Sequence, residues 1–160
     1  MKLSALRPIL VAMPIVWVTA LGAATVTSSR PVVGVAAYAF SAAVYEVGSL
    51  LCHQLPERSF HYRGVQLPVC ARCVGLYVGA AAAAIAAMRM RRTKSRQVWD
   101  RARVLLSVAA VPTAVTLIDE WFSGHMPSHW IRAAAGFPLG AIVMLIVVAA
   151  ATPESVVEIH

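Results

Sequence analysis

The apolar positions of the chain fall into five long blocks separated by short polar links. The blocks cover residues 9–27, 33–51, 69–89, 104–122 and 132–151. Each is close to the about 20 apolar residues that a helix needs to cross the hydrocarbon core of a bilayer. The pattern predicts an all-α, polytopic helical membrane protein of about five transmembrane helices, with a four-helix core and an N-terminal span. Residues 1–160 then form a single domain.

Composition supports this class. Of the 160 residues, 59% are hydrophobic and only 13% are charged, which is too apolar for an ordinary soluble domain. Lys2 and Arg7 precede the first block, and a small-residue stretch at 21–24 resembles a signal-peptide cleavage site. The first block is long for a signal core, so we expect it to remain as a span.

The net charge of +7 is concentrated in one link. Seven basic residues lie between positions 89 and 103, a pattern typical of a cytoplasmic loop and not of a nucleic-acid-binding surface. We therefore expect a multi-pass protein of the bacterial inner membrane, with this link in the cytoplasm and no nucleic-acid partner. The alternation of spans then leaves the N-terminus on the outer face, despite Lys2 and Arg7.

The three cysteines all lie near the outer edge of the predicted bundle. Cys70 and Cys73 are separated by three residues, so both thiols share one helix face near a helix start. Cys52 and His53 end the second block and can approach this pair across the intervening link. Three thiolates and one imidazole complete a tetrahedral zinc shell. The sequence therefore predicts Cys52, His53, Cys70 and Cys73 as ligands of zinc or another divalent transition metal.

Two arginines share helix faces with glycine patches that let helices approach closely. Arg72 precedes one Gly-x-x-x-Gly patch and Arg132 precedes the other. The patches are Gly75 with Gly79 and Gly136 with Gly140. Close packing would bring the two positive charges together, so they need an anion between them, either Asp119 or a bound phosphate or carboxylate. We expect Arg72, Arg132 and Arg58 to bind an anionic, lipid-like or small-molecule ligand.

Three residues are candidates for catalytic roles. Glu46 lies seven residues before His53, on the same helix face and about 10 Å deeper by helical rise. Such a carboxyl group suits a proton path or a group that supports the metal ligands. Asp119 shares a face with Thr116, which points it toward polar neighbours, whereas Glu120 is expected to face water. Glu46, His53 and Asp119 are thus the predicted catalytic residues.

The loop after the fourth block holds two further histidines. His125 and His129 lie on either side of Pro127. Their imidazoles could supply a metal ligand or a general base.

The segments that carry these side chains resemble a known family. They are Cys52-His53-Gln54, Arg58-Ser59-Phe60, the run from Pro68 to Cys73, and Gly75-Leu76-Tyr77. They are similar to an uncharacterised family of prokaryotic membrane proteins, domain of unknown function 2085. The resemblance implies a small polytopic membrane protein and carries no established activity.

Three functions fit the sequence. The first is a metal-dependent membrane hydrolase, in which the metal activates water against an anionic lipid-like substrate. A metal with all four positions filled would only staple the hairpin. The second is a thiol–disulfide oxidoreductase that uses Cys70 and Cys73 with a quinone, although three cysteines do not make two pairs. The third is a small transporter or metal-handling protein that depends on Glu46.

Overall fold

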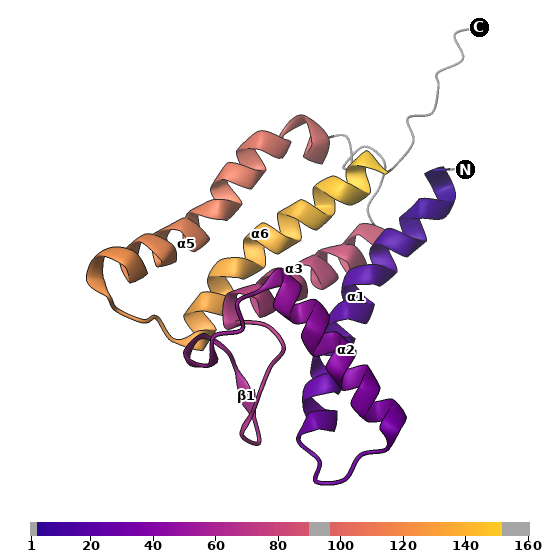
Figure 1. Cartoon of the computed structure of the whole chain (residues 1–160). Coiled ribbons are helices and arrows are strands. Elements are labelled where there is room, and N and C mark those ends of the chain that lie inside the picture. The colour runs from indigo at the N-terminus through magenta and orange to yellow at the C-terminus, as the bar shows by residue number, and fades with distance from the viewer. Residues whose placement is uncertain (1–2, 90–96, 152–160) are drawn as a thin grey trace, which may run out of the picture.

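The computed structural model describes residues 3–89 and 97–151, and most of this part of the chain is helical (Figure 1). The elements are α1 (Leu3–Ser28), α2 (Val35–Leu51), the 3-10 turn η1 (Pro56–Arg58), β1 (His61–Tyr62), β2 (Val65–Gln66), α3 (Ala71–Met88), α5 (Ala102–Ser123) and α6 (His129–Ala150). Arg91, Arg92, Lys94 and Arg96 of the basic link lie outside the described residues. The predicted all-α polytopic class is confirmed, since α1, α3, α5 and α6 are each long and apolar enough to cross a membrane.

The second predicted span differs from the other four. It forms α2, an apolar helix of only 17 residues. The Ser41 hydroxyl near the start of α2 donates to the carbonyl of Ala24 near the end of α1. At the other end of α2, the Cys52 sulfur accepts a hydrogen bond from the amide of Cys70 at the start of α3. Both ends of α2 therefore lie toward one end of the bundle, and α2 does not run from one end to the other (Figure 1).

The path of α1 corrects the predicted position of the N-terminus. α1 runs antiparallel to α3, because the Arg7 guanidinium donates to the Ala87 carbonyl at 2.8 Å and the Trp17 ring meets Tyr77 edge-on. The start of α1 thus lies beside the end of α3, where the basic link begins. The expectation that the N-terminus lies at the opposite face is wrong, and it failed because α2 was counted as a crossing.

The central contact of the bundle joins α3 to α6. A Cβ atom added at Gly75 or Gly79 would collide with the backbone carbonyls of Ala133 and Phe137 in α6. A Cβ atom on the α6 side would collide with carbonyls of α3, and the glycines concerned are Gly136, which faces Arg72, and Gly140, which faces Leu76. The two backbones therefore touch directly, as the glycine patches predict.

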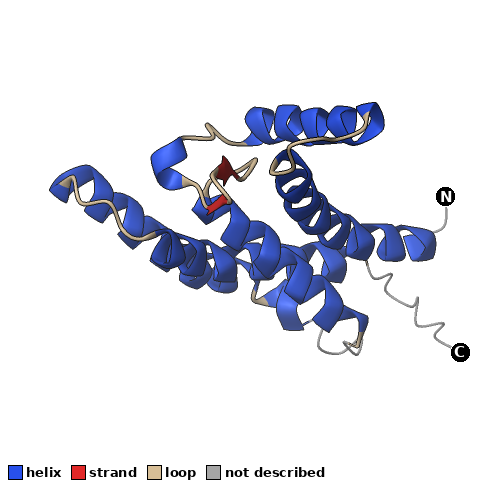
Figure 2. Cartoon of the chain, turned by 90° about the horizontal axis from the view of Figure 1, so that it is seen from below, coloured by secondary structure: helices blue, strands red, loops and turns tan. Residues whose placement is uncertain are grey.

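Helix α5 is attached to the bundle more loosely than α3 and α6 are attached to each other. α5 packs on α6, where the Thr113 hydroxyl donates to the Ala135 carbonyl at 2.8 Å, but most of α5 is exposed. Its exposed side chains include Val104, Val108, Val111, Val115 and Ile118, which suit contact with lipid. In the view from below, helices make up most of the described chain, and the β1–β2 hairpin is a small addition (Figure 2).

Replacement of Gly140 by alanine should destabilise the protein. The added methyl group has no space against the Leu76 backbone, so α3 and α6 must separate. Overpacking of this kind costs about 1–3 kcal/mol, which thermal unfolding in detergent would detect. Gly22→Ala is the matched control, because nothing lies within 4 Å of a Cβ there. Equal melting temperatures for the two variants would contradict the direct backbone contact.

The position of the α1–α2 link distinguishes a topology of four crossings from one of five. The two topologies place this link on opposite sides of the membrane. We expect cysteines introduced at Arg30 and Arg63, both exposed, to react with an impermeant maleimide in intact cells. A cysteine at Gln97, next to the basic link, should react only after permeabilisation. Each variant is compared with the labelling of the wild-type protein. Protection at position 30 together with labelling at position 63 would show that α2 crosses the membrane.

Candidate metal and anion site

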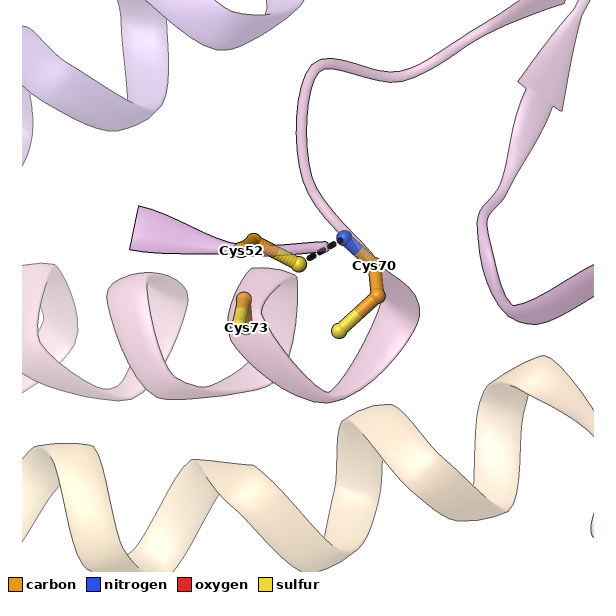
Figure 3. A group of neighbouring side chains, drawn as sticks. All are labelled: Cys52, Cys70 and Cys73. Carbon is orange, nitrogen blue, oxygen red and sulfur yellow. Dashed lines mark hydrogen bonds between the residues drawn. The ribbon is translucent and has the colours of Figure 1, made fainter. Parts of the chain in front are cut away.

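The three cysteines come together where α2 ends and α3 begins. Cys52 is the residue that caps the end of α2, Cys70 caps the start of α3, and Cys73 lies in the first turn of α3. Their sulfur atoms all lie within 4.8 Å of one another, and the Cys70 amide donates to the Cys52 sulfur at 3.3 Å (Figure 3). All three are free thiols and partly buried. The structure thus brings the three cysteines together, whereas their role as metal ligands stays a prediction.

The environment of Cys70 favours a thiolate. Hydrogen bonding from the Cys73 thiol, with smaller help from Cys52 and backbone amides, lowers the pKa of Cys70 to about 5, although burial acts in the opposite direction. Thiolates are the form of cysteine that binds metals. Zinc–sulfur bonds of about 2.3 Å place two bound sulfurs roughly 3.8 Å apart in a tetrahedron. The cluster therefore needs only small adjustments to hold one ion.

Gln54 connects the two segments that supply the cysteines. Its side-chain amide donates to the carbonyl of Tyr45 in α2 at 2.9 Å and to that of Pro68, just before Cys70, at 2.7 Å. Its backbone is left-handed, with φ of 48°. Gly48 makes the approach possible, since a Cβ there would meet the Pro68 carbonyl and the Gln54 amide. The hydrogen bonds of the Gln54 side chain therefore hold the segments of Cys52 and Cys70 at a fixed spacing.

A second set of contacts folds the intervening loop. The Gln66 side-chain amide donates to the Gln54 carbonyl at 2.5 Å and to the hydroxyl of Ser59 at 3.2 Å. Ser59 is fully buried, and its hydroxyl donates to the Leu55 carbonyl. Phe60 packs its ring against the rings of His129 and Trp130 at the start of α6. The loop is thus anchored on α6, and this fixes the position of Arg58 beside the helices.

The charged centre of the site is Glu120, near the end of α5. Its carboxylate accepts from Arg58 at 2.8 Å, from Arg132 at 3.0 Å and from Arg72 at 3.5 Å. Arg72 also donates to the hydroxyl of Thr116 at 3.3 Å. The side chains of Glu120 and Arg132 are only 5% and 3% exposed. The structure thus brings the two helix arginines together at one carboxylate, and Arg58 joins them.

These charges do not balance. Three guanidiniums surround one carboxylate, which leaves an excess of two positive charges. Within the described residues, the Nε atoms of Arg58, Arg72 and Arg132 are also buried without a hydrogen-bond partner. Buried donors and charges of this kind are costly unless they are paired. The cluster therefore retains the capacity to bind a further anion.

A pocket of about 370 Å³ connects the cysteines to the arginines. Its lining residues come from the end of α2, the following loop, α3 and the start of α6. They are Leu51, Cys52, His53, Gln54, Leu55, Arg58, Cys70, Arg72, Cys73, Leu76 and Arg132. His53 lines this pocket but is not one of the residues whose ligand atoms converge. Three sulfurs, and not three sulfurs with His53, make up the structural cluster.

Other predicted site residues lie elsewhere. The proposal that Asp119 neutralises the arginines is wrong, since its side chain is 50% exposed and faces His125 at 3.5 Å. Glu46 is exposed on α2 and does not line the pocket. It was expected deep in the membrane because α2 was taken to be a span. His129 contacts the carbonyl of Glu57 at 3.2 Å and so helps to hold the loop.

Glu120 is the residue of the site that the sequence-based prediction missed. It was expected to face water, yet it is buried among arginines. A signal was present in the spacing of Thr113, Thr116 and Glu120, which follow one another by three and four residues and so share a helix face. Both threonines face the bundle, as their contacts with Ala135 and Arg72 show.

We expect Glu120→Gln to destabilise the protein by on the order of 3 kcal/mol. The variant leaves three arginines without a counter-charge, and breaking a buried charge pair has a cost of this size. Asp119→Asn, one position earlier and exposed, should change stability by less than about 0.5 kcal/mol. Thermal unfolding in detergent compares the two. A larger loss for Asp119→Asn would contradict the observed charge arrangement.

Comparisons of the sequence with known proteins support its assignment as a membrane protein. The chain is 31% identical over 104 residues to an uncharacterised protein of Methanocaldococcus jannaschii, with 65% of each chain covered, which is just under two thirds of that relative. It is 32% identical over 91 residues to an uncharacterised protein of Methanothermobacter thermautotrophicus, covering 56% of this chain and 78% of the relative. No solved structure matches. A family model described as "Predicted membrane protein (DUF2085)" matches residues 52–146, more than half of the chain, and the protein therefore belongs to that family.

Proposed function

We propose that this protein is a metal-dependent membrane hydrolase whose metal, zinc, is held by Cys52, Cys70 and Cys73. The observation that carries the proposal is that the three sulfurs converge at a pocket that three arginines also line. A metal and an anion-binding group that share one cavity suit hydrolysis of an anionic substrate. The substrate would be lipid-like or a small molecule.

The number of ligands supports a reactive metal over a structural one. Structural zinc is held by four protein ligands, whereas catalytic zinc keeps a position open for water or substrate. Three cysteines would supply three ligands, so a metal held by them would keep one position open if His53 does not bind. Zinc held by three cysteines activates water in some deaminases. If His53 does bind, the metal staples the end of α2 to α3 and has no catalytic position.

The pocket residues can take separate roles in hydrolysis. Arg58, Arg72 and Arg132 would hold the anionic group of the substrate. His53, which lines the pocket, would accept a proton from the attacking water. The water oxygen forms a bond to the phosphorus or carbonyl carbon, and the bond to the leaving oxygen breaks as that oxygen takes up a proton. The site lies at the end of the bundle away from the basic link. Because the positive-inside rule places that link in the cytoplasm, the site would lie at the extracytoplasmic face of the cell membrane.

Thiol–disulfide exchange is the second candidate. It is favoured by the position of Cys70 at the start of α3, with its lowered pKa and with Cys73 within 4.8 Å. Oxidation of these two thiols would form one disulfide and release two electrons and two protons, which a membrane quinone could accept. Cys52, adjacent to both, would then serve as the third thiol of the exchange.

The purified protein should hold about one zinc or similar divalent ion per chain. Its three thiols should resist alkylation until a chelator is added, because bound thiolates are not free to react. Cys70→Ser should lose the ion and reduce stability, while His53→Ala should keep the ion. Elemental analysis and a thiol count on the same samples measure both quantities.

The same measurements distinguish the alternatives. Loss of the ion in His53→Ala would identify a closed, structural shell. A protein with no ion and one free thiol per chain, in which reductant restores three, would contradict the metal site and support the oxidoreductase.

A further inference from the structure

We infer that the cluster of Arg58, Arg72 and Arg132 around Glu120 binds a phosphate group. This inference deepens the proposed function, because it names the charged group of the substrate. The inference rests on the proposed function only for the reaction, since binding of phosphate by the arginines requires no metal. Experiments can therefore contradict phosphate binding and metal-dependent hydrolysis separately.

The charge of the cluster selects the ligand. One carboxylate leaves two positive charges uncompensated, and the side chains of Arg72 and Arg132 are only 17% and 3% exposed. Salt screening is weak for these two buried charges. A phosphate monoester or inorganic phosphate carries close to two negative charges at neutral pH. A single carboxylate or a phosphodiester would compensate only half of the excess.

The geometry of the donors points the same way. The three guanidiniums come from three separate elements, with Arg58 on η1, Arg72 on α3 and Arg132 on α6. All three line the pocket, and Arg132 is 2% exposed with its Nε unpaired within the described residues. Donors that arrive from several directions suit a tetrahedral oxyanion with three or four acceptor oxygens. A planar carboxylate offers only two oxygens.

The remaining lining residues extend the ligand beyond the phosphate. Leu51, Leu55 and Leu76 line the same pocket, and the side chains of Leu51 and Leu55 are exposed. A volume of about 370 Å³ is larger than one phosphate needs. The phosphate could therefore belong to a lipid headgroup, such as that of phosphatidic acid, or arrive free from solution.

The direct test is thermal unfolding of the purified full-length protein in detergent with increasing inorganic phosphate. A ligand that binds only the folded state raises the melting temperature. Acetate at equal ionic strength is the control anion. In parallel, the protein is reconstituted in nanodiscs of phosphatidylcholine with or without phosphatidic acid. A shift with free phosphate in detergent identifies a soluble phosphate source, and a shift only with phosphatidic acid identifies a lipid headgroup.

Variants separate a binding site from a structural salt bridge. Arg58→Gln removes the most exposed arginine of the three, and we expect it to weaken phosphate binding by about tenfold, the effect of one charge-assisted hydrogen bond. Arg63→Gln, in the exposed hairpin away from the pocket, should bind as the wild type does. Glu120→Gln raises the uncompensated charge to three, so phosphate should stabilise this variant more than it stabilises the wild type.

Three results would overturn the inference. Stabilisation by acetate equal to that by phosphate, or no stabilisation by phosphate or phosphatidic acid in either wild type or Glu120→Gln, would overturn the inference. An equal loss of binding in Arg58→Gln and Arg63→Gln would do the same. Phosphate binding that persists in protein stripped of metal, or in Cys70→Ser, would uphold the anion site while the proposed hydrolase is judged on the metal measurements alone.

Discussion

The backbones of α3 and α6 touch directly, and this contact determines where the residues of the site lie. Four glycines leave no side chain between the two helices, so their separation and register are set by the main chain itself. The Arg72 carbonyl faces Gly136, and Arg132 is next to Ala133, whose carbonyl faces Gly75, so the two arginines are brought to the same depth. Cys70 and Cys73 occupy the same end of α3, which explains why the thiols and the guanidiniums share a pocket.

The parts of the structure that follow from local spacing could be predicted from sequence. The cysteine pair one turn apart, and the arginines aligned with glycine patches, both depend on the period of a single helix. The helix of 17 residues shows the opposite case. Its length and apolar content are close to those of a span, and only its contacts with Ala24 and Cys70 show that it turns back to the same end.

Glu120 illustrates a second limit of sequence reasoning. Adjacent helical residues differ in direction by about 100°, since a helix has 3.6 residues per turn. Asp119 and Glu120 therefore face different environments, and the choice between them depends on where α6 and the loop lie. His53 presents the same difficulty at the cysteines, because it follows Cys52 directly and yet its imidazole is not among the ligand atoms that converge. Neither the position of a neighbouring helix nor a left-handed turn is encoded in the spacing.

The loose attachment of α5 gives the charge cluster a second role in the fold. Helix α5 packs on α6, and the Glu120 carboxylate is its ionic contact with Arg72 of α3 and with Arg58 of the loop. Glu120 uses only part of the donors that the three arginines offer, since their Nε atoms have no hydrogen-bond partner within the described residues. If the inferred phosphate binds, it would join the same guanidiniums beside Glu120, and by reciprocity the position of α5 would influence the affinity for phosphate. The end of α5 and the ligand would thus be two counter-ions of one cationic cluster.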